Sequence, residues 1–200
     1  MAHKKKAKKP KELEKEENKQ GKELDEGKIE VFLVSLEDER VIGHTQEAKD
    51  LYAQSRFGEP VGDKIQYALV EALYLLEKGK IEVQEDGKKI NFDAFVAQAR
   101  KIEHHFWVRY CAYKDLRSRG YIVKTALKFG ADFRVYDRGI KPGDDHAKWV
   151  VFPVHESETL TWFEFAAKNR VAHSTRKRLL LAIIDAESAT TYYEVSWKRP

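Results

Sequence analysis

Apolar residues are almost absent from the first 27 positions and recur regularly only beyond Lys28. A segment of Lys, Glu and Gly cannot bury enough apolar surface to offset its ordering entropy, so we expect residues 1–27 to form a disordered charged tail. Beyond it, Ile29–Leu36 and Val41–Gly43 have the apolar character of short strands. The acidic Asp38–Glu39 pair is the predicted turn between them.

Helical spacing follows these strands. Thr45 is a suitable N-cap for a helix that runs to about Arg56 and stops at Gly58. Asp63 is the predicted cap of a longer helix that ends at Gly79. One face of this longer helix carries apolar residues at helical spacing: Ile65, Leu69, Ala72 and Leu76.

A hairpin and a further helix complete this half of the chain. Ile81–Val83 and Lys89–Ile90 flank a Glu85–Gly87 turn, as the strands of a hairpin do. A helix that begins at Asn91 or Asp93 and continues through Ala99 follows.

The pattern changes beyond Lys101. A helix over residues 103–119 carries several aromatic residues and ends at Gly120. Three strand-like stretches follow: Tyr121–Lys124, Asp132–Tyr136 and Trp149–Val154. The segment Asp137–Lys148 separates the last two, and its two glycines and one proline mark it as a loop.

The C-terminal part ends in a helix and two strands. Thr161 and Glu164 have the spacing of a capping box, which opens a helix predicted to run to about Arg178. Leu179–Asp185 is typical of a buried strand, and Thr190–Trp197 returns as the last strand.

These elements predict an α+β / α/β fold. Residues 28–100 form a small N-terminal α+β domain. Residues 101–200 form a C-terminal domain with a mixed β-sheet flanked by helices. No internal repeat divides the chain further.

The net charge of +4 is unevenly distributed. Residues 29–100 carry nine Lys and Arg against fourteen Asp and Glu, whereas residues 101–200 carry eighteen against twelve. The basic half is therefore the expected contact for a polyanion such as nucleic acid. An ordinary solvated surface is also compatible with this excess, so charge alone favours nucleic acid only weakly.

The compartment follows from what the chain contains. Cys111 is the only cysteine, which leaves it without an intramolecular disulfide and is typical of the reducing cytoplasm. The longest apolar run, Leu179–Ile184, is far too short to span a bilayer, and the Lys-rich N-terminus lacks the apolar stretch of a secretory signal. We expect a cytoplasmic protein without membrane contact.

Tyr136 is the first residue with candidate chemistry. A tyrosine at the end of a strand is usually half-buried packing. A free phenol has a pKa near 10 and acts as a base at neutral pH only where cations favour the phenolate. Arg134, Arg138 and Lys177 are candidates for that role.

His146 and Lys177 are the other candidates. His146 lies in a polar loop, where an imidazole is well suited to act as a general acid. A surface histidine, or one paired with Asp144 or Asp145, fits the same pattern. Lys177 suits the stabilisation of a negatively charged transition state, and it equally suits a cation in the last turn of a helix.

Metal chemistry has weaker support. Four histidines could suggest a metal site: His104, His105, His155 and His173. No HExxH or paired-cysteine spacing accompanies them, and the Asp144–Asp145 pair lacks the partner acid of a metal nuclease. We therefore expect neither a metal nor another cofactor.

Two blocks of sequence resemble the catalytic domain of archaeal tRNA-splicing endonucleases. Residues 121–136 read YIVKTALKFGADFRVY, and residues 171–185 read VAHSTRKRLLLAIID. A terminal YYEVSW strand follows at residues 192–197. The phrase VEALYLLEKGKIEV at residues 70–83 resembles the N-terminal domain of the same family. The resemblance spans roughly residues 60–200, and its motifs are specific.

This resemblance implies a tRNA-intron endonuclease with a catalytic C-terminal domain. Its substrate is precursor tRNA, cut at the 5′ and 3′ splice sites of a bulge–helix–bulge to give 2′,3′-cyclic phosphate and 5′-hydroxyl ends. The family pattern assigns Tyr136 as the base, His146 as the acid and Lys177 as the group that stabilises the transition state. It also implies a homotetramer, or a heterotetramer with a structural subunit.

Substrate contacts are implied in the same way. Arg170 stands seven residues before Lys177, where the family has an arginine that clamps a bulged base. Trp197 is the candidate for the opposite side of that clamp.

Subunit contacts complete the expectation. The acidic turn with Asp185 and Glu187 matches a loop that docks on a neighbouring subunit in the family. The last strand, with Tyr193 and Val195, is too apolar for a free edge and is a second expected interface.

Three other functions stay open. The first is a non-catalytic structural subunit of such an endonuclease, against which the presence of all three candidate residues argues. The second is a metal-dependent nuclease of related fold, and the third is a non-catalytic module that binds structured RNA.

Overall fold

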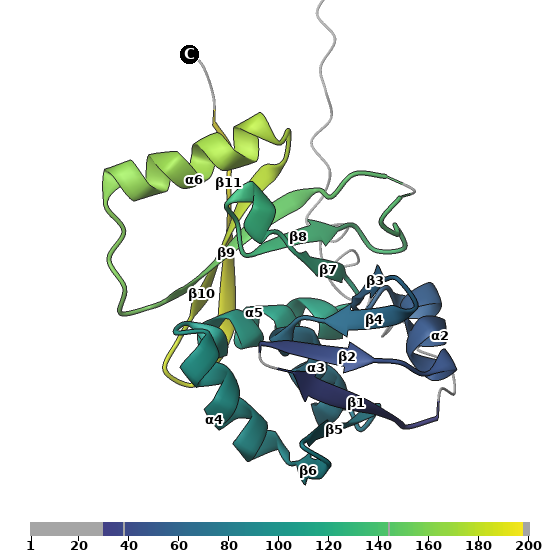
Figure 1. Cartoon of the computed structure of the whole chain (residues 1–200). Coiled ribbons are helices and arrows are strands. Elements are labelled where there is room, and N and C mark those ends of the chain that lie inside the picture. Colours follow the sequence, from purple (N-terminus) through teal and green to yellow (C-terminus); the bar gives the residue numbers. More distant parts are fainter. Residues whose placement is uncertain (1–29, 38, 144, 198–200) are drawn as a thin grey trace, which may run out of the picture.

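The computed structural model describes residues 30–37, 39–143 and 145–197, so the tail predicted over residues 1–27 lies outside it. Two β-sheets with helices between and around them make up these residues (Figure 1). The first sheet and its helices come from the N-terminal half of the chain, and the second sheet comes from the C-terminal half.

The N-terminal sheet has six strands in the order β3-β4-β2-β1-β5-β6. Neighbouring strands are antiparallel except for β1 and β5, which are parallel. The strands are β1 (Phe32–Glu37), β2 (Arg40–Gly43), β3 (Glu59–Val61), β4 (Lys64–Tyr67), β5 (Ile81–Glu85) and β6 (Lys88–Ile90). The helices are α2 (Gln46–Ser55), α3 (Leu69–Glu77) and α4 (Phe92–Ile102).

The long helix predicted from Asp63 is wrong at its start. Lys64–Tyr67 form β4, and α3 begins only at Leu69. Ile65 has helical spacing to Leu69, but the backbone around it pairs with both β2 and β3. Because this pairing satisfies the backbone on both sides, tertiary contacts override the local helical pattern. β3 has no counterpart among the predicted elements.

Two helix ends also differ from the prediction. The Thr45 side chain caps α2 as expected, by accepting a hydrogen bond from Ala48 N at 3.4 Å. The helix ends at Ser55, because its C-cap Arg56 already takes the left-handed conformation, with a φ of 60°, two residues before Gly58. Asn91 caps α4, which continues to Ile102, past the predicted end at Ala99.

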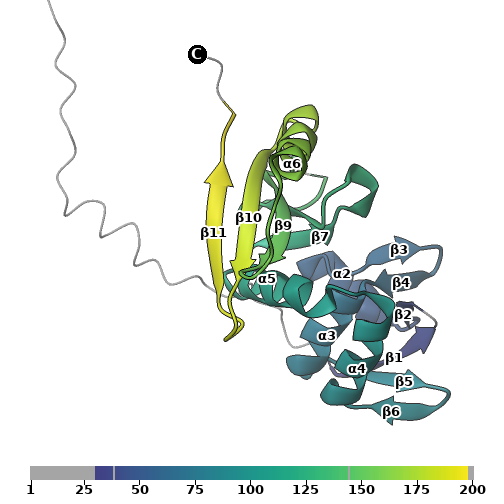
Figure 2. The same ribbon diagram turned by 90° about the vertical axis from the view of Figure 1, so that its left-hand side faces the viewer.

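The C-terminal sheet has five strands in the order β11-β10-β9-β8-β7. It is mixed, because β9 and β10 are parallel and the other neighbours are antiparallel. The strands are β7 (Ile122–Thr125), β8 (Phe133–Tyr136), β9 (Trp149–His155), β10 (Arg178–Ile184) and β11 (Thr190–Val195). Figure 2 shows β11 at the outer edge of this sheet.

Two helices cover this sheet. α5 (Phe106–Ser118) packs with Val135 and Val151, whereas α6 (Trp162–Ser174) packs with Val150. Since successive strand residues point to opposite faces, α5 and α6 lie against opposite faces of the sheet. The predicted mixed sheet flanked by helices is therefore confirmed.

α6 begins as predicted and ends early. Thr161 Oγ1 accepts from Glu164 N at 3.2 Å, and Glu164 Oε2 accepts from Thr161 N at 2.8 Å, which completes the capping box. The helix ends at Ser174 and not near Arg178, because Arg178 already belongs to β10. Lys177 therefore lies outside the helix.

α5 connects the two halves. Its aromatic residues Phe106, Tyr110 and Tyr113 are buried in one apolar core that includes α3 and both sheets. A buried ion pair adds to this junction: Lys124 Nζ of β7 lies 3.2 Å from Glu71 Oε1 of α3, and both side chains are 3% exposed. The same ammonium donates to the carbonyls of Arg56 and Gly58. These contacts fix the C-terminal sheet against the N-terminal half.

Candidate active site

Two of the three candidate catalytic residues lie at the same end of the strands of the C-terminal sheet. Val135 of β8 pairs with Trp149 of β9, which pairs with Arg178 of β10. The regular pairing of β8 and β9 stops there, because Lys148 N donates to Val135 O at 2.9 Å, one residue out of register. Arg178 N donates to Lys148 O at 3.0 Å, as the parallel pair of Trp149 and Arg178 requires. The residues next to these paired positions therefore lie at the same end of three neighbouring strands: Tyr136, Lys148 and Lys177.

Tyr136 is buried at this end of the sheet. Its side chain is 5% exposed and packs with Ile122, Ala147 and the partly buried Ile140. Two of these neighbours, Ile140 and Ala147, belong to the loop that follows β8. The loop thus covers the tyrosine.

His146 is held near Tyr136 by its neighbour in the chain. Ala147 is buried against Tyr136, so His146, the residue before it, lies at the same end of the sheet. The imidazole is exposed, and the His146 backbone N donates to Asp145 Oδ1 at 2.6 Å. The His146 ring is thus open to solvent, whereas the Tyr136 side chain is covered by the loop.

Lys177 owes its position to the turn after α6. Arg176 takes a left-handed φ of 54°, its backbone N donates to His173 O, and Lys177 N donates to Ala172 O at 2.8 Å. These two bonds form a Schellman motif, in which a non-glycine residue occupies the strained position. Lys177 is half-buried, and its Nζ donates to Thr175 O at 2.9 Å. A main-chain carbonyl leaves the ammonium charge available to a phosphate.

The two arginines expected near the phenol are engaged elsewhere. Arg134 lies 3.7 Å from Glu59 Oε1 of β3, and the Arg138 guanidinium stacks 4.9 Å from the centre of the Tyr121 ring. Lys148, which sequence reasoning missed, directly precedes β9, the strand that lies between β8 and β10. Its two-residue spacing from His146, on the approach to a strand, is the signal that could have identified it.

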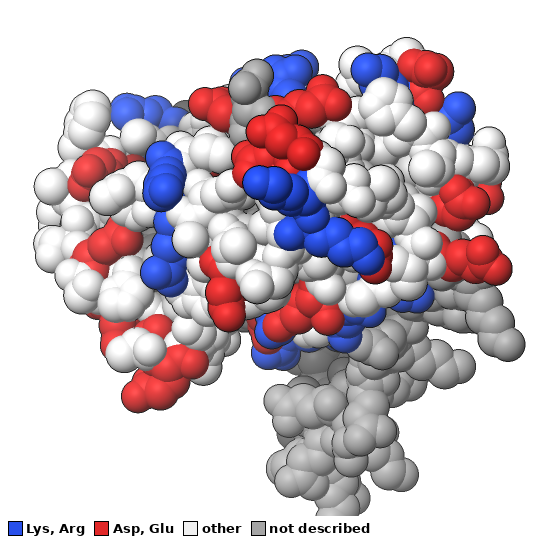
Figure 3. All heavy atoms as spheres, turned by 60° about the horizontal axis from the view of Figure 1, so that its bottom comes forward, with Lys and Arg blue, Asp and Glu red and all other residues white. Residues whose placement is uncertain are grey.

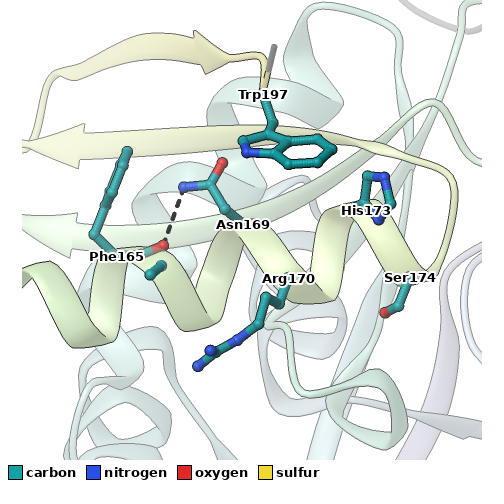
Figure 4. Close-up of a pocket in the computed structure, with 7 residues that line it drawn as sticks. Phe165, Asn169, Arg170, His173, Ser174 and Trp197 are labelled. Atoms are coloured by element: carbon teal, nitrogen blue, oxygen red, sulfur yellow. Dashed lines mark hydrogen bonds between the residues drawn. The ribbon is translucent and has the colours of Figure 1, made fainter. Parts of the chain in front are cut away.

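The predicted clamp residues share a hollow beside α6. This open hollow of about 600 Å³ is lined mainly by apolar atoms, and both Arg170 and Trp197 border it (Figure 4). Trp197 is 58% exposed and meets the His173 ring edge-on at 5.1 Å. Figure 4 shows the Arg170 side chain directed away from Trp197. Trp197 also borders a second hollow, which includes Lys177.

The predicted interface residues lie on β11 and the turn before it. Asp185 Oδ1 accepts from Ala189 N at 2.7 Å, so this carboxylate is used within its own turn rather than projected. Glu187 is exposed. Tyr193 is 58% exposed, whereas Val195 packs partly into the cluster under α6.

Charges of both signs are interspersed on the face that Figure 3 shows. In the described part of the chain, no three His, Cys, Asp or Glu side chains gather closely enough to hold a metal ion. Within the same residues, no helix has the length and apolar character needed to cross a membrane.

Comparisons with known proteins identify the family of this chain. Residues 106–192 match a family described as tRNA intron endonuclease, catalytic C-terminal domain, and residues 33–96 match tRNA intron endonuclease, N-terminal domain. A tRNA-splicing endonuclease of Nanoarchaeum equitans is 51% identical over 70% of this chain and 93% of its own length. Proteins of the same name from Thermococcus onnurineus and Methanothermobacter thermautotrophicus are each 40% identical, over 81% and 82% of this chain and 94% and 96% of their own lengths.

Proposed function

This chain belongs to the tRNA intron endonuclease family, and we propose that it cuts precursor tRNA at the 5′ and 3′ splice sites of a bulge–helix–bulge. In this proposal residues 101–200 form the catalytic domain and residues 28–100 the N-terminal domain. One observation carries the proposal: the strand pairing brings Tyr136 and Lys177 to the same end of the sheet, and Ala147, the neighbour of His146, packs on Tyr136.

The proposed reaction is a transesterification within the RNA. Tyr136 removes the proton of the 2′-hydroxyl, whose oxygen attacks the adjacent phosphorus in line. The bond from phosphorus to the 5′ oxygen breaks, and His146 donates a proton to that oxygen. The products are a 2′,3′-cyclic phosphate and a 5′-hydroxyl. The scheme uses side chains alone and needs no cofactor.

Lys177 stabilises the additional negative charge of the pentavalent transition state. A cation preplaced where charge develops is worth more than one recruited during the reaction. The Schellman turn supports this role, because Lys177 N is itself one of its hydrogen-bond donors and the lysine backbone is therefore fixed.

RNA recognition and assembly complete the proposal. Arg170 and Trp197 hold an unstacked bulge base at the hollow beside α6, whose apolar lining suits a base. Two cuts require two sites, so the chain acts as a homotetramer or with a structural subunit. Glu187, Tyr193 and the edge strand β11 are the proposed contacts between subunits.

The test is cleavage of a minimal bulge–helix–bulge RNA by this chain alone, in excess EDTA. We expect cutting at both splice sites, with cyclic phosphate ends identified by their resistance to phosphatase until acid opens the ring. Tyr136→Phe is the matched control, because it keeps the buried ring and removes only the hydroxyl.

The other functions give different results. Loss of cleavage in EDTA that Mg²⁺ restores would identify a metal-dependent nuclease. Binding without cleavage under every condition would identify an RNA-binding module. Cleavage that appears only after a second chain is added, and that survives Tyr136→Phe, would identify a structural subunit.

A further inference from the structure

The loop that carries His146 is fastened at both of its ends. It leaves β8 at Asp137 and enters β9 after Lys148. Lys148 Nζ lies 2.6 Å from Asp137 Oδ2, so the first and last residues of the loop form an ion pair. Asp137 Oδ1 also accepts from Arg138 N at 3.1 Å. The ion pair therefore closes the base of the loop.

Aromatic contacts extend this closure. The Lys148 ammonium lies 4.4 Å from the centre of the Trp149 ring, and Trp149 meets Tyr121 edge-on at 5.8 Å. The Arg138 guanidinium lies 4.9 Å from the Tyr121 ring and returns to the start of the loop. We refer to these five side chains as the neck cluster: Asp137, Lys148, Trp149, Tyr121 and Arg138.

The neck cluster lies next to both proton-transfer candidates. Asp137 directly follows Tyr136, and Lys148 is two residues beyond His146. Between these ends, Ile140 and Ala147 pack on Tyr136. A shift of either loop end would therefore move the imidazole relative to the phenol.

We propose that the Asp137–Lys148 pair positions His146 for proton donation to the leaving group. The proposal rests on the proposed function, because it acts through the assigned acid. Lys148 is a positioning residue in it, with its charge neutralised by Asp137, while Lys177 keeps its charge for the phosphate. A displacement of about 1 Å in such a group costs up to about 10²-fold in rate.

Exposure separates this role from a purely structural one. The side chains of Lys148 and Asp137 are 37% and 41% exposed. Ion pairs that exposed contribute little to folding. Removing the pair should therefore leave the melting temperature close to that of the unmodified chain.

The first measurement compares single-turnover cleavage with RNA affinity. For Lys148→Met and Asp137→Asn we expect a roughly 10- to 100-fold lower cleavage rate with the RNA Kd changed by less than about threefold. Lys148→Arg and the reversed pair Asp137→Lys with Lys148→Asp should restore part of the rate. Lys128→Met, at an exposed lysine outside the neck cluster, is the control for the loss of one positive charge.

The second measurement replaces the 5′ leaving oxygen of the RNA with sulfur. A thiolate leaves without protonation, so this substrate does not need the general acid. We expect it to recover most of the rate lost in His146→Ala and in Lys148→Met. Lys177→Met should stay slow, because its role concerns the charge on the phosphorane.

The outcomes distinguish a failure of the proposed mechanism from a failure of the positioning role. If sulfur fails to rescue His146→Ala, the assignment of the acid is wrong and the proposed mechanism fails. If sulfur rescues His146→Ala but not Lys148→Met, the mechanism stands and the positioning role is overturned. A parallel loss of RNA affinity and rate in Lys148→Met would make Lys148 a phosphate contact instead.

Discussion

Two of the proposed catalytic residues, Tyr136 and Lys177, owe their positions to local backbone features. Tyr136 is the last residue of a paired strand and is buried by the loop that follows it. Lys177 lies in the Schellman turn that ends α6, and its Nζ donates to the carbonyl of the C-cap Thr175, so a helix-dipole role also fits its position. Residue type alone does not identify Lys148, because its place near Tyr136 and Lys177 depends on the arrangement of three strands.

Substitution of His146 by alanine should lower turnover without lowering RNA affinity. Positioned acid–base catalysis is worth roughly 10²–10⁴-fold, so we expect a fall of that size in single-turnover rate. The imidazole is exposed and belongs to no apolar cluster described above, so folding should be unchanged. A gel-shift titration checks the affinity. If binding and rate fall together, His146 contacts the RNA and is not the acid.

Substitution of Arg170 by alanine should weaken cleavage of bulged substrates. Stacking against one base is worth about 1–3 kcal/mol, which corresponds to roughly one to two orders of magnitude in rate. Arg170 is exposed on α6, with its guanidinium 5.9 Å from the Phe163 ring, so stability should not change.

Mixed oligomers test whether that clamp acts between subunits. Arg170→Ala chains mixed with Lys177→Ala chains should recover part of the activity if each supplies what the other lacks. Trp197 borders both the Arg170 hollow and the hollow with Lys177, which also permits a clamp within one chain. No recovery in the mixture would place the clamp within one chain, and a wild-type rate for Arg170→Ala would remove it altogether.

At the scale of elements, the sequence predicts those whose signals are local. The Asp86–Gly87 turn, the Thr161–Glu164 capping box and the edge strand β11 all follow from short patterns. β4 does not, because Ile65 satisfies helical spacing and only its partners in β2 and β3 select the strand. In the same way, motif residues identify the catalytic candidates, whereas the contacts of the neck cluster join segments that are distant in sequence.

The junction between α3 and α5 should depend on pH through Glu77. Its carboxylate lies 2.6 Å from Lys114 Nζ and accepts from Tyr110 Oη at 2.7 Å. Burial alone raises the pKa of Glu77, but the hydrogen bonds from Lys114 and Tyr110 outweigh it and hold the pKa below its ordinary value. A lowered folded pKa gives stability that is present above the unfolded pKa, about 4.3, and is lost as pH falls through the folded value.

Glu77→Gln should therefore be less stable than the unmodified chain at pH 7 by about 1–2 kcal/mol. The difference should shrink towards zero at an acidic pH below the folded pKa, where Glu77 of the unmodified chain is protonated. Urea denaturation at both pH values measures it. Glu82→Gln, which breaks the exposed pair with Lys89, is the control and should have a small effect. A difference that persists at low pH would attribute the loss to geometry rather than to charge.

At the scale of the whole molecule, the two halves behave as one packed body. The aromatic residues of α5 share a core with both sheets, and the Lys124–Glu71 pair is buried between the halves. These contacts fix the orientation of the C-terminal sheet relative to the N-terminal half. One end of its strands carries Tyr136, Lys148 and Lys177. Its edge strand β11 has no strand neighbour on its outer side among the described residues.

Assembly should depend on Glu187 rather than on the whole acidic turn. The Asp185 carboxylate accepts from Ala189 N, Ala186 N donates to Glu156 Oε1 at 3.0 Å, and the Trp107 indole donates to Ser188 Oγ at 3.1 Å. The turn is thus already fixed on its own chain, and Glu187 is left exposed for a neighbour.

We expect Glu187→Lys to lower the oligomer mass in multi-angle light scattering, with a melting curve that still shows a folded chain. Glu82→Lys, the same charge change on the N-terminal sheet, should leave the mass unaltered. An unchanged mass for Glu187→Lys at dilute protein would mean that the turn is a solvated hairpin tip and that the apolar edge at β11 alone joins the subunits.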